Sequence, residues 1–114
     1  MERIRADGYE LLAVTGEIDI ATSPRLIAAL NEAVTDSSDS VVVDLAGVEF
    51  MDSTGLALLA RQHRRLRGRR RGFAVVCPDG PVRRIFELTD MVETLNVRPT
   101  REAALSAAGN GLPT

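Results

Sequence analysis

The chain has 114 residues, of which 45% are hydrophobic and 26% are charged, a composition typical of a globular protein with one domain. The formal net charge of −2 is unevenly distributed: residues 1–60 carry 3 arginines and 11 acids, whereas residues 61–114 carry 11 arginines and 5 acids. No stretch approaches the roughly 18 apolar residues of a membrane span, and the opening residues lack the hydrophobic region of a signal peptide. We therefore expect a cytosolic protein.

The first elements predicted are a strand and a helix. The apolar run at 9–19 predicts a strand that gives way, at Gly16, to a turn and a short extended piece. A helix is expected over 23–34, with Ser23 as its N-cap and Pro24 at the first helical position, where the missing N–H costs nothing. Residues at helical spacing predict its buried face, namely Leu26, Ile27, Leu30, Ala33 and Val34.

The middle of the chain repeats this alternation. Residues 40–50 predict a strand, and their continuous valine run indicates burial on both faces of a sheet. Helical spacing then holds from Leu56 to Leu66, until the glycine- and arginine-rich stretch 68–72 breaks the helix. Residues 73–77 predict a second buried strand.

The last third follows the same pattern. Residues 78–91 predict a helix with Pro81 near its first turn, and 95–97 predict a short strand. Thr100 is then expected to cap a final helix that runs to about Ala108. The alternation of strands and helices favours one α/β layer structure, with helices packed on a mixed sheet.

A polar motif, Asp52–Ser53–Thr54–Gly55, stands where the long strand ends and the next helix begins. It can be structural, with Asp52 or Ser53 capping the helix and Gly55 letting another backbone come close. It can also be a phosphorylation site, because a phosphate on the first turn would meet unpaired N–H groups and the positive end of the macrodipole. A phosphate adds about −1.5 to −2 charge units, which would disrupt a partner contact more readily than create one.

Catalysis by this motif is not expected. Ser53 would need a base, and His63, the only histidine, lies ten positions further on, about 15 Å along the same helix. One histidine and one cysteine give no metal-ligand spacing, and no glycine-rich phosphate loop is present. Cys77 ends an apolar run and is expected to be a small buried hydrophobic side chain. The residues therefore indicate no enzyme, cofactor or metal site.

Two charged segments have alternative interpretations. The stretch from Arg61 to Arg71, which we call the arginine run, holds seven arginines in eleven residues. It can be the solvated end of a helix, a protein-docking surface or a nucleic-acid patch. Aromatic residues that could stack on bases are scarce, at one Tyr and three Phe. Glu17 and Asp19 can serve turn chemistry, or form an acidic, hydroxyl-rich surface if the fold brings them to Ser53.

Read together, these segments resemble a known family. GEID followed by a helix, then VVVDLAGVEFMDSTGLALL and GFAVVCPDGPVRRIFELTDM, are similar to the bacterial anti-sigma factor antagonists, the stand-alone STAS domains. The similarity runs in order over about residues 10–105. It implies a single α/β domain at 1–108, with a mixed four- to five-stranded sheet and about four helices packed on it, followed by a flexible tail at 109–114.

The resemblance also implies a mechanism called partner switching. The unmodified antagonist binds an anti-sigma factor that is also a serine kinase, and this frees a sigma factor. The kinase then uses ATP to phosphorylate the antagonist, and a serine phosphatase restores it. By position, Ser53 matches the phosphorylated serine, and Asp19, Asp52, Thr54 and Gly55 join it in the implied partner-binding surface.

The implied protein is a cytoplasmic regulatory domain that has no enzymatic activity and no cofactor, and that makes no direct contact with nucleic acid or membrane. Two alternatives stay open. One is a STAS-type accessory subunit of a membrane transporter, without modification at Ser53. The other is a nucleic-acid-binding domain that uses the arginine run.

Overall fold

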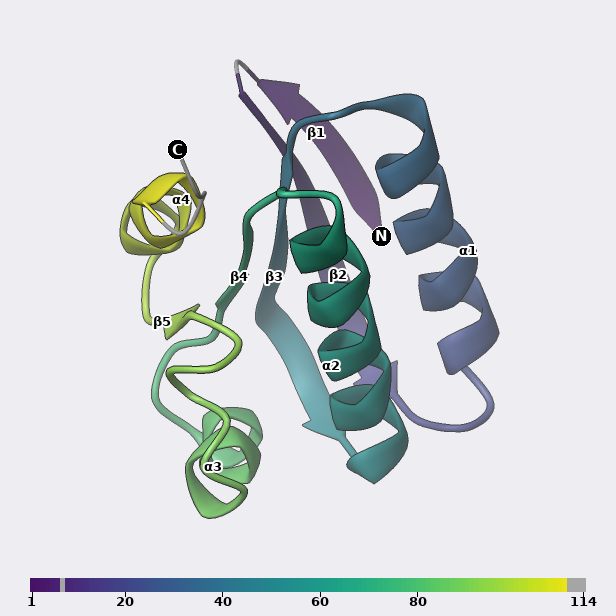
Figure 1. The fold of residues 1–114 in the computed structure, drawn as a ribbon. Coiled ribbons are helices and arrows are strands. Elements are labelled where there is room, and N and C mark those ends of the chain that lie inside the picture. Colours follow the sequence, from purple (N-terminus) through teal and green to yellow (C-terminus); the bar gives the residue numbers. More distant parts are fainter. Residues whose placement is uncertain (7, 111–114) are drawn as a thin grey trace.

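A mixed sheet forms the middle of the molecule, and the computed structural model describes residues 1–6 and 8–110 of the chain. The strands lie in the order β1-β2-β3-β4-β5. β1 is antiparallel to β2, and the remaining neighbours are parallel. The bounds are β1 (Glu2–Ala6), β2 (Tyr9–Ile18), β3 (Ser40–Met51), β4 (Phe73–Val76) and β5 (Val97–Arg98) (Figure 1). The expected mixed sheet is confirmed.

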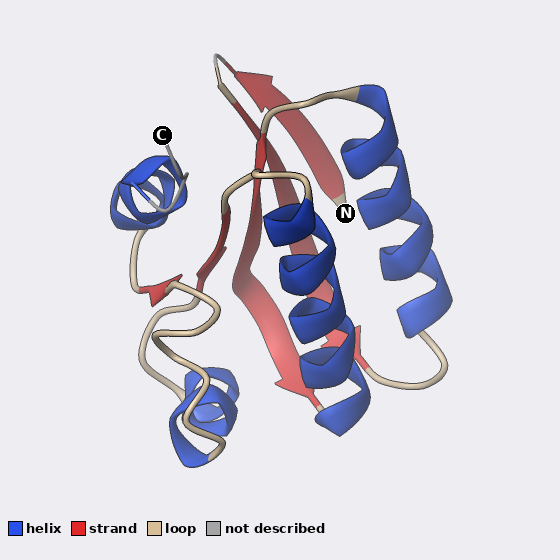
Figure 2. Ribbon diagram, viewed as in Figure 1, coloured by secondary structure: helices blue, strands red, loops and turns tan. Residues whose placement is uncertain are grey.

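Four described helices pack on this sheet, and they cover both of its faces (Figures 1 and 2). α1 and α2 lie side by side on one face, α4 lies on the other, and α3 packs against β3. Their bounds are α1 (Ser23–Asp36), α2 (Ser53–Gly68), α3 (Pro81–Leu88) and α4 (Arg101–Asn110). The predicted helices are therefore confirmed, with ends that differ by a few residues.

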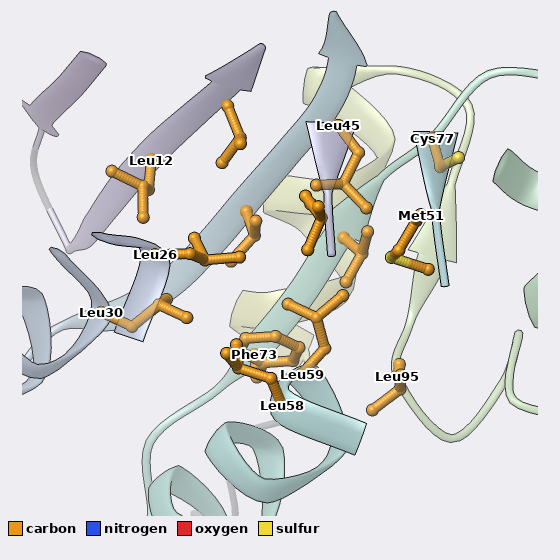
Figure 3. Close-up of a cluster of buried hydrophobic side chains, with 14 of the residues drawn as sticks. Leu12, Leu26, Leu30, Leu45, Met51, Leu58, Leu59, Phe73, Cys77 and Leu95 are labelled. Atoms are coloured by element: carbon orange, nitrogen blue, oxygen red, sulfur yellow. The ribbon is translucent and has the colours of Figure 1, made fainter. Parts of the chain in front are cut away.

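The valine run of β3 supplies both cores, as its sequence predicted. Val41 and Val43 belong to the larger core, and Val42 belongs to a smaller core beneath α4; all three are 0% exposed. In the larger core, leucines of α1 and α2 meet leucines of the sheet and Phe73 (Figure 3). Burial of this apolar surface, at about 25 cal/mol per Å², holds both helices on the sheet.

The first strand, β1, was missed by the sequence analysis. It has only five residues, three of them charged, so the alternation of Ile4 and Ala6 with Arg3 and Arg5 is too short to stand out in the sequence. β1 is held on β2 by the backbone ladder, by Ile4 packed against the smaller core, and by Arg3 and Arg5, which pair with the carboxylate of Glu10, a side chain that is 1% exposed. This pairing joins residues of two strands, which a pattern within one short segment does not reveal.

Two local predictions around the first helix were wrong. Gly16, whose φ is 85°, does not end the strand, because β2 runs through it to Ile18. The register shifts beside Gly16, where one extra residue of β3, Glu49, has no partner in β2. Ser23 is not the N-cap of α1, because Thr22 holds that position, without a side-chain cap hydrogen bond. Thr100, by contrast, does accept a hydrogen bond from the amide of Ala103 at 3.2 Å.

The first two residues of the predicted tail, 109–110, belong to the last helix. α4 continues through Asn110, so it includes the first two positions that were assigned to the tail. Residues 111–114 lie outside the described residues.

Candidate functional site

Asp52 is the N-cap of α2, as one interpretation of the motif predicted. Its backbone is extended, and its Oδ1 accepts hydrogen bonds from the amides of Thr54 at 2.9 Å and Gly55 at 3.3 Å. Ser53 is the first residue of the helix and is exposed, and its hydroxyl has no hydrogen bond to any described residue. The serine is therefore held on a fixed helix start with its oxygen open to a partner.

The surroundings of Ser53 differ in one respect from the prediction. The sequence predicts unpaired first-turn amides that a phosphate could use, but the amides of Thr54 and Gly55 already bind Asp52. Because Asp52 already takes these two amides, a phosphate on Ser53 would find no empty site there. Its charge would therefore project outward and add to that of Asp52.

The parallel pairing of β2 and β3 places the Asp19 loop beside this helix start. Ile18, the last residue of β2, lies opposite Met51, the last residue of β3. The amide of Asp52 donates to the carbonyl oxygen of Ile18 at 3.2 Å. The carboxyl ends of the two strands thus bring Asp19 next to Asp52, and the fold joins the two segments that the sequence presents separately.

The Asp19 side chain organises its own loop. Its Oδ1 accepts hydrogen bonds from the amides of Ala21 and Thr22, both at 3.0 Å, and the amide of Asp19 donates to the Thr22 hydroxyl oxygen at 2.9 Å. These bonds fix the loop that presents Ile20, whose exposed fraction is 77%. Asp19 consequently shapes the surface beside Ser53.

Two apolar residues of this surface were missed by the sequence analysis. Ile20 stands in the Asp19 loop, and Phe50, 50% exposed, precedes Met51 at the end of β3. Phe50 lines a hollow of about 170 Å³ between β3 and α3, together with Glu49, Met51, Pro81, Val82 and Ile85. The only signal in the sequence is that each of them follows an acidic residue near the end of a strand, Ile20 after Asp19 and Phe50 after Glu49. Exposed apolar side chains of this kind favour protein contacts.

Gly55 is buried, and its tight neighbours are side chains rather than another backbone. A Cβ at this position would lie 2.6 Å from Cγ of Met51 and 2.8 Å from Cγ2 of Ile18. The close approach of a second backbone, expected from the sequence, is therefore wrong. Gly55 lets α2 sit closely on the ends of β2 and β3.

His63 and Cys77 are both placed as packing residues. The ring of His63 lies 6.0 Å from that of Phe73, centroid to centroid, and burial and the nearby Arg67 and Arg64 lower its pKa. Ten residues of helix separate it from Ser53, about 15 Å, so it does not activate that hydroxyl. Cys77 is buried, and burial raises its pKa to about 11. No group of three potential metal ligands occurs in residues 1–6 and 8–110.

The arginine run divides into anchored and free side chains. Arg71 is buried and donates to the carbonyl oxygens of Asp39 and Val34, both at 2.7 Å. Arg65 ties α2 to α1 by donating to Oδ1 of Asn31 at 2.7 Å. The others make no hydrogen bond or ion pair through their side chains within the described part of the chain: Arg61, Arg64, Arg67, Arg69 and Arg70.

The comparisons with known proteins agree with this architecture. A sequence model described as STAS domain matches residues 2–104. The chain belongs to the STAS domain family. The anti-sigma-F factor antagonist RsfB of Mycobacterium tuberculosis (strain H37Rv) is 33% identical to this STAS domain over 105 residues, which cover 92% of this chain and 85% of RsfB.

Solved structures show the same similarity. The crystal structure of an anti-sigma factor antagonist from Mycobacterium paratuberculosis superposes with a TM-score of 0.86 at 37% identity, covering 95% of this chain and 92% of that one. A sulfate transporter family protein from Wolinella succinogenes has a TM-score of 0.75 at 17% identity, covering 95% and 90%, which is a likeness of fold alone. Among the described helices of this STAS domain, none has the length and hydropathy to cross a membrane.

Proposed function

We propose that this STAS domain is an anti-sigma factor antagonist that works by partner switching in the cytoplasm. The observation that carries the proposal is Ser53, exposed on the first residue of α2 with its hydroxyl free of other described groups, inside an Asp-Ser-Thr-Gly motif. Relatives 33% and 37% identical over nearly the whole chain are named as antagonists of anti-sigma factors. The sulfate transporter family structure is only 17% identical and supports the fold alone. It therefore gives the alternative of a transporter accessory subunit less support than the antagonists give the proposed function.

The unmodified domain binds the anti-sigma factor through the start of α2 and the Asp19 loop. Ile20 and Phe50 supply the apolar contacts next to Ser53 and Thr54. Gly55 contributes from beneath by letting α2 sit close to the sheet. When this domain is bound to it, the anti-sigma factor releases its sigma factor.

The partner then acts as a serine kinase on Ser53. The serine oxygen attacks the γ-phosphorus of ATP, a new O–P bond forms as the bond to ADP breaks, and the serine proton passes to a base supplied by the kinase. ATP belongs to the partner's active site, and this domain supplies only the hydroxyl. A serine phosphatase later hydrolyses the ester and restores the binding form.

Phosphorylation weakens binding by charge. A phosphate brings about −1.5 to −2 charge units to a surface that already holds Asp52 and Asp19 beside Ser53. Burying that charge without a cation from the partner costs free energy, and a hundredfold loss of affinity needs only about 2.7 kcal/mol. The domain itself stays folded, because Asp52 continues to cap α2.

Intact-mass spectrometry tests the proposal. The domain is incubated with each anti-sigma factor kinase of its source cell and ATP, and Ser53→Ala and Thr54→Ala are treated in the same way. We expect a gain of one phosphate, about 80 Da, in the wild type and in Thr54→Ala but not in Ser53→Ala. Absence of the gain with every kinase, together with stable co-purification with a transporter, would establish the accessory-subunit alternative instead.

A further inference from the structure

Helix α2 carries Ser53 and two free arginines along one outward face. Ala57, Arg61 and Arg64 follow Ser53 at spacings of four, eight and eleven residues, which keeps them on the same side of an α-helix. All four residues are exposed. We call them the α2 stripe. The opposite face of the helix is buried and consists of Gly55, Leu58, Leu59, Gln62 and Leu66.

The arginines of the α2 stripe have no counter-charge within the described chain. None of the seven arginines in the arginine run makes an ion pair there, although carboxylates pair with arginines elsewhere. The paired ones are Arg3, Arg5, Arg83, Arg98 and Arg101. Asp52 lies at the other end of the helix, so α2 presents an acidic start and a cationic second half.

We propose that the whole α2 stripe is one docking surface and that Arg61 and Arg64 face an acidic segment of the anti-sigma factor. This inference rests on the proposed function and specifies the partner's chemistry. A protein interface of standard size buries roughly 800 Å² per partner, a disc of about 16 Å radius. A disc of this size centred on Ser53 includes Arg61, about 12 Å along the helix, and ends just short of Arg64, about 16.5 Å along it.

Charges at the rim of an interface act mainly on the rate of encounter and on orientation. The acidic start of α2 and its cationic second half give the helix a direction. The partner therefore needs acidic groups opposite Arg61 and Arg64, and none opposite Asp52. In this arrangement the arginines guide the partner so that its active site meets Ser53.

A nucleic acid fits the α2 stripe less well than a protein. Base stacking needs exposed aromatic side chains beside the cations, but the stripe has none. Phe73 and Phe86 are buried in the core, and Phe50, which is 50% exposed, lies at the end of β3, near the Ser53 end of α2 rather than beside the arginines. Arg65 and Arg71 are held by hydrogen bonds within the domain, which reduces the number of cations free for phosphates. Ser53 at one end of the stripe favours the protein that modifies it.

Stopped-flow association with the anti-sigma factor that binds the domain tests the inference. The variant Arg61→Gln/Arg64→Gln is compared with Arg69→Gln/Arg70→Gln, which has the same net charge but changes the exposed turn beyond α2. We expect the first variant to associate about 5- to 20-fold more slowly at low salt, with a weaker salt dependence and a dissociation rate within about twofold of the wild type. The control variant should stay within about twofold in both rates.

The outcomes separate this inference from the proposed function. Normal binding with unchanged association in both variants, or equal slowing in both, would overturn the docking role of the stripe and leave the antagonist function intact. Failure of the wild type to bind any anti-sigma factor would overturn both. Binding of a 20-base-pair DNA duplex by the wild type, lost in Arg61→Gln/Arg64→Gln but kept in the control, would assign the stripe to nucleic acid and overturn the inference.

Discussion

The backbone amide of Asp52 donates a hydrogen bond to the carbonyl oxygen of Ile18 at 3.2 Å, and this bond joins the start of α2 to the end of β2. A Cβ on Gly55 would meet the side chain of Ile18 at 2.8 Å, so the same two elements are also packed closely. Ser53 and the Asp19 loop are consequently parts of one rigid surface. A change at either one is expected to act on the same partner.

Replacing Ser53 by Asp tests the charge switch without a kinase. We expect Ser53→Asp to weaken binding to the anti-sigma factor by about a hundredfold, or about 2.7 kcal/mol, because the new carboxylate lies beside Asp52. Ser53→Ala should bind like the wild type. Isothermal titration calorimetry gives the affinities, and circular dichroism should show little change in melting temperature.

The matched control is Ser38→Asp, which adds the same charge at an exposed position just before the start of β3, at the other end of the sheet. It should bind normally. Equal affinities for the wild type and Ser53→Asp would rule out charge as the switch.

Gly55 is expected to matter through packing. In Gly55→Ala the new Cβ would press on Cγ of Met51 at 2.6 Å, so we expect a loss of about 1–3 kcal/mol in the free energy of unfolding. Gly68→Ala is the control, because nothing lies within 4 Å of a Cβ there. It should be neutral or stabilise the helix by up to about 1 kcal/mol. Urea unfolding measures both, and equal stabilities would contradict the packing role.

Asp52 can be tested separately as a cap and as a charge. Asp52→Ala removes the acceptor for the amides of Thr54 and Gly55 and should cost about 1 kcal/mol of unfolding free energy, whereas Asp52→Asn keeps an acceptor and should cost less. Asp52→Asn also removes the charge beside Ser53. The phosphorylated form of this variant should therefore lose less affinity than phosphorylated wild type, and an unchanged loss would show that Asp52 does not add to the repulsion.

Glu10 links stability to acid pH. The Arg3 guanidinium, whose Nη2 donates to Oε1 at 2.9 Å, lowers the pKa of Glu10. Because the pKa of Glu10 is lower in the folded state, its ionised carboxylate stabilises the protein fully when the pH is above the ordinary glutamate pKa of about 4.3. This contribution is lost as the pH falls through the folded-state pKa. Glu10→Gln should therefore be less stable than wild type by about 1–3 kcal/mol near neutral pH.

The same difference should shrink as the pH is lowered from about 4. Urea unfolding of both proteins over a pH series measures this dependence. A difference that stayed constant down to the acid end of the series would show that the ionised carboxylate is not the stabilising form.

Cys77 should resist alkylation in the folded protein. Its side chain is buried, and its pKa is raised to about 11, so very little thiolate exists near pH 8. We expect no iodoacetamide adduct on the native domain and complete reaction after unfolding in guanidinium chloride, both read by intact mass. Rapid reaction of the native protein would show that β4 opens readily at its end.

Much of the fold follows from local patterns in the chain. The valine run of β3 and the leucines of α1 and α2 have periods of hydrophobicity that specify strand or helix wherever one face must be buried. The sequence also locates the start of α2, with Asp52 or Ser53 as its cap, because an N-cap acts on amides two and three residues away, and the structure identifies Asp52. The motif at Ser53 could thus be located before any tertiary contact was known.

Interactions between distant segments were decided only by the tertiary structure. The apolar pattern of β1 is too short to identify it, and its arginines pair with Glu10 of the next strand. Arg71, in the same way, leaves the arginine run to bind the carbonyl oxygens of Val34 and Asp39. The Asp19 loop reaches Ser53 because two parallel strands end at the same edge of the sheet. The periodicity of apolar side chains indicates which residues face inward, but the topology of the chain determines which residues contact one another. The surface around Ser53 therefore exists only in the folded domain.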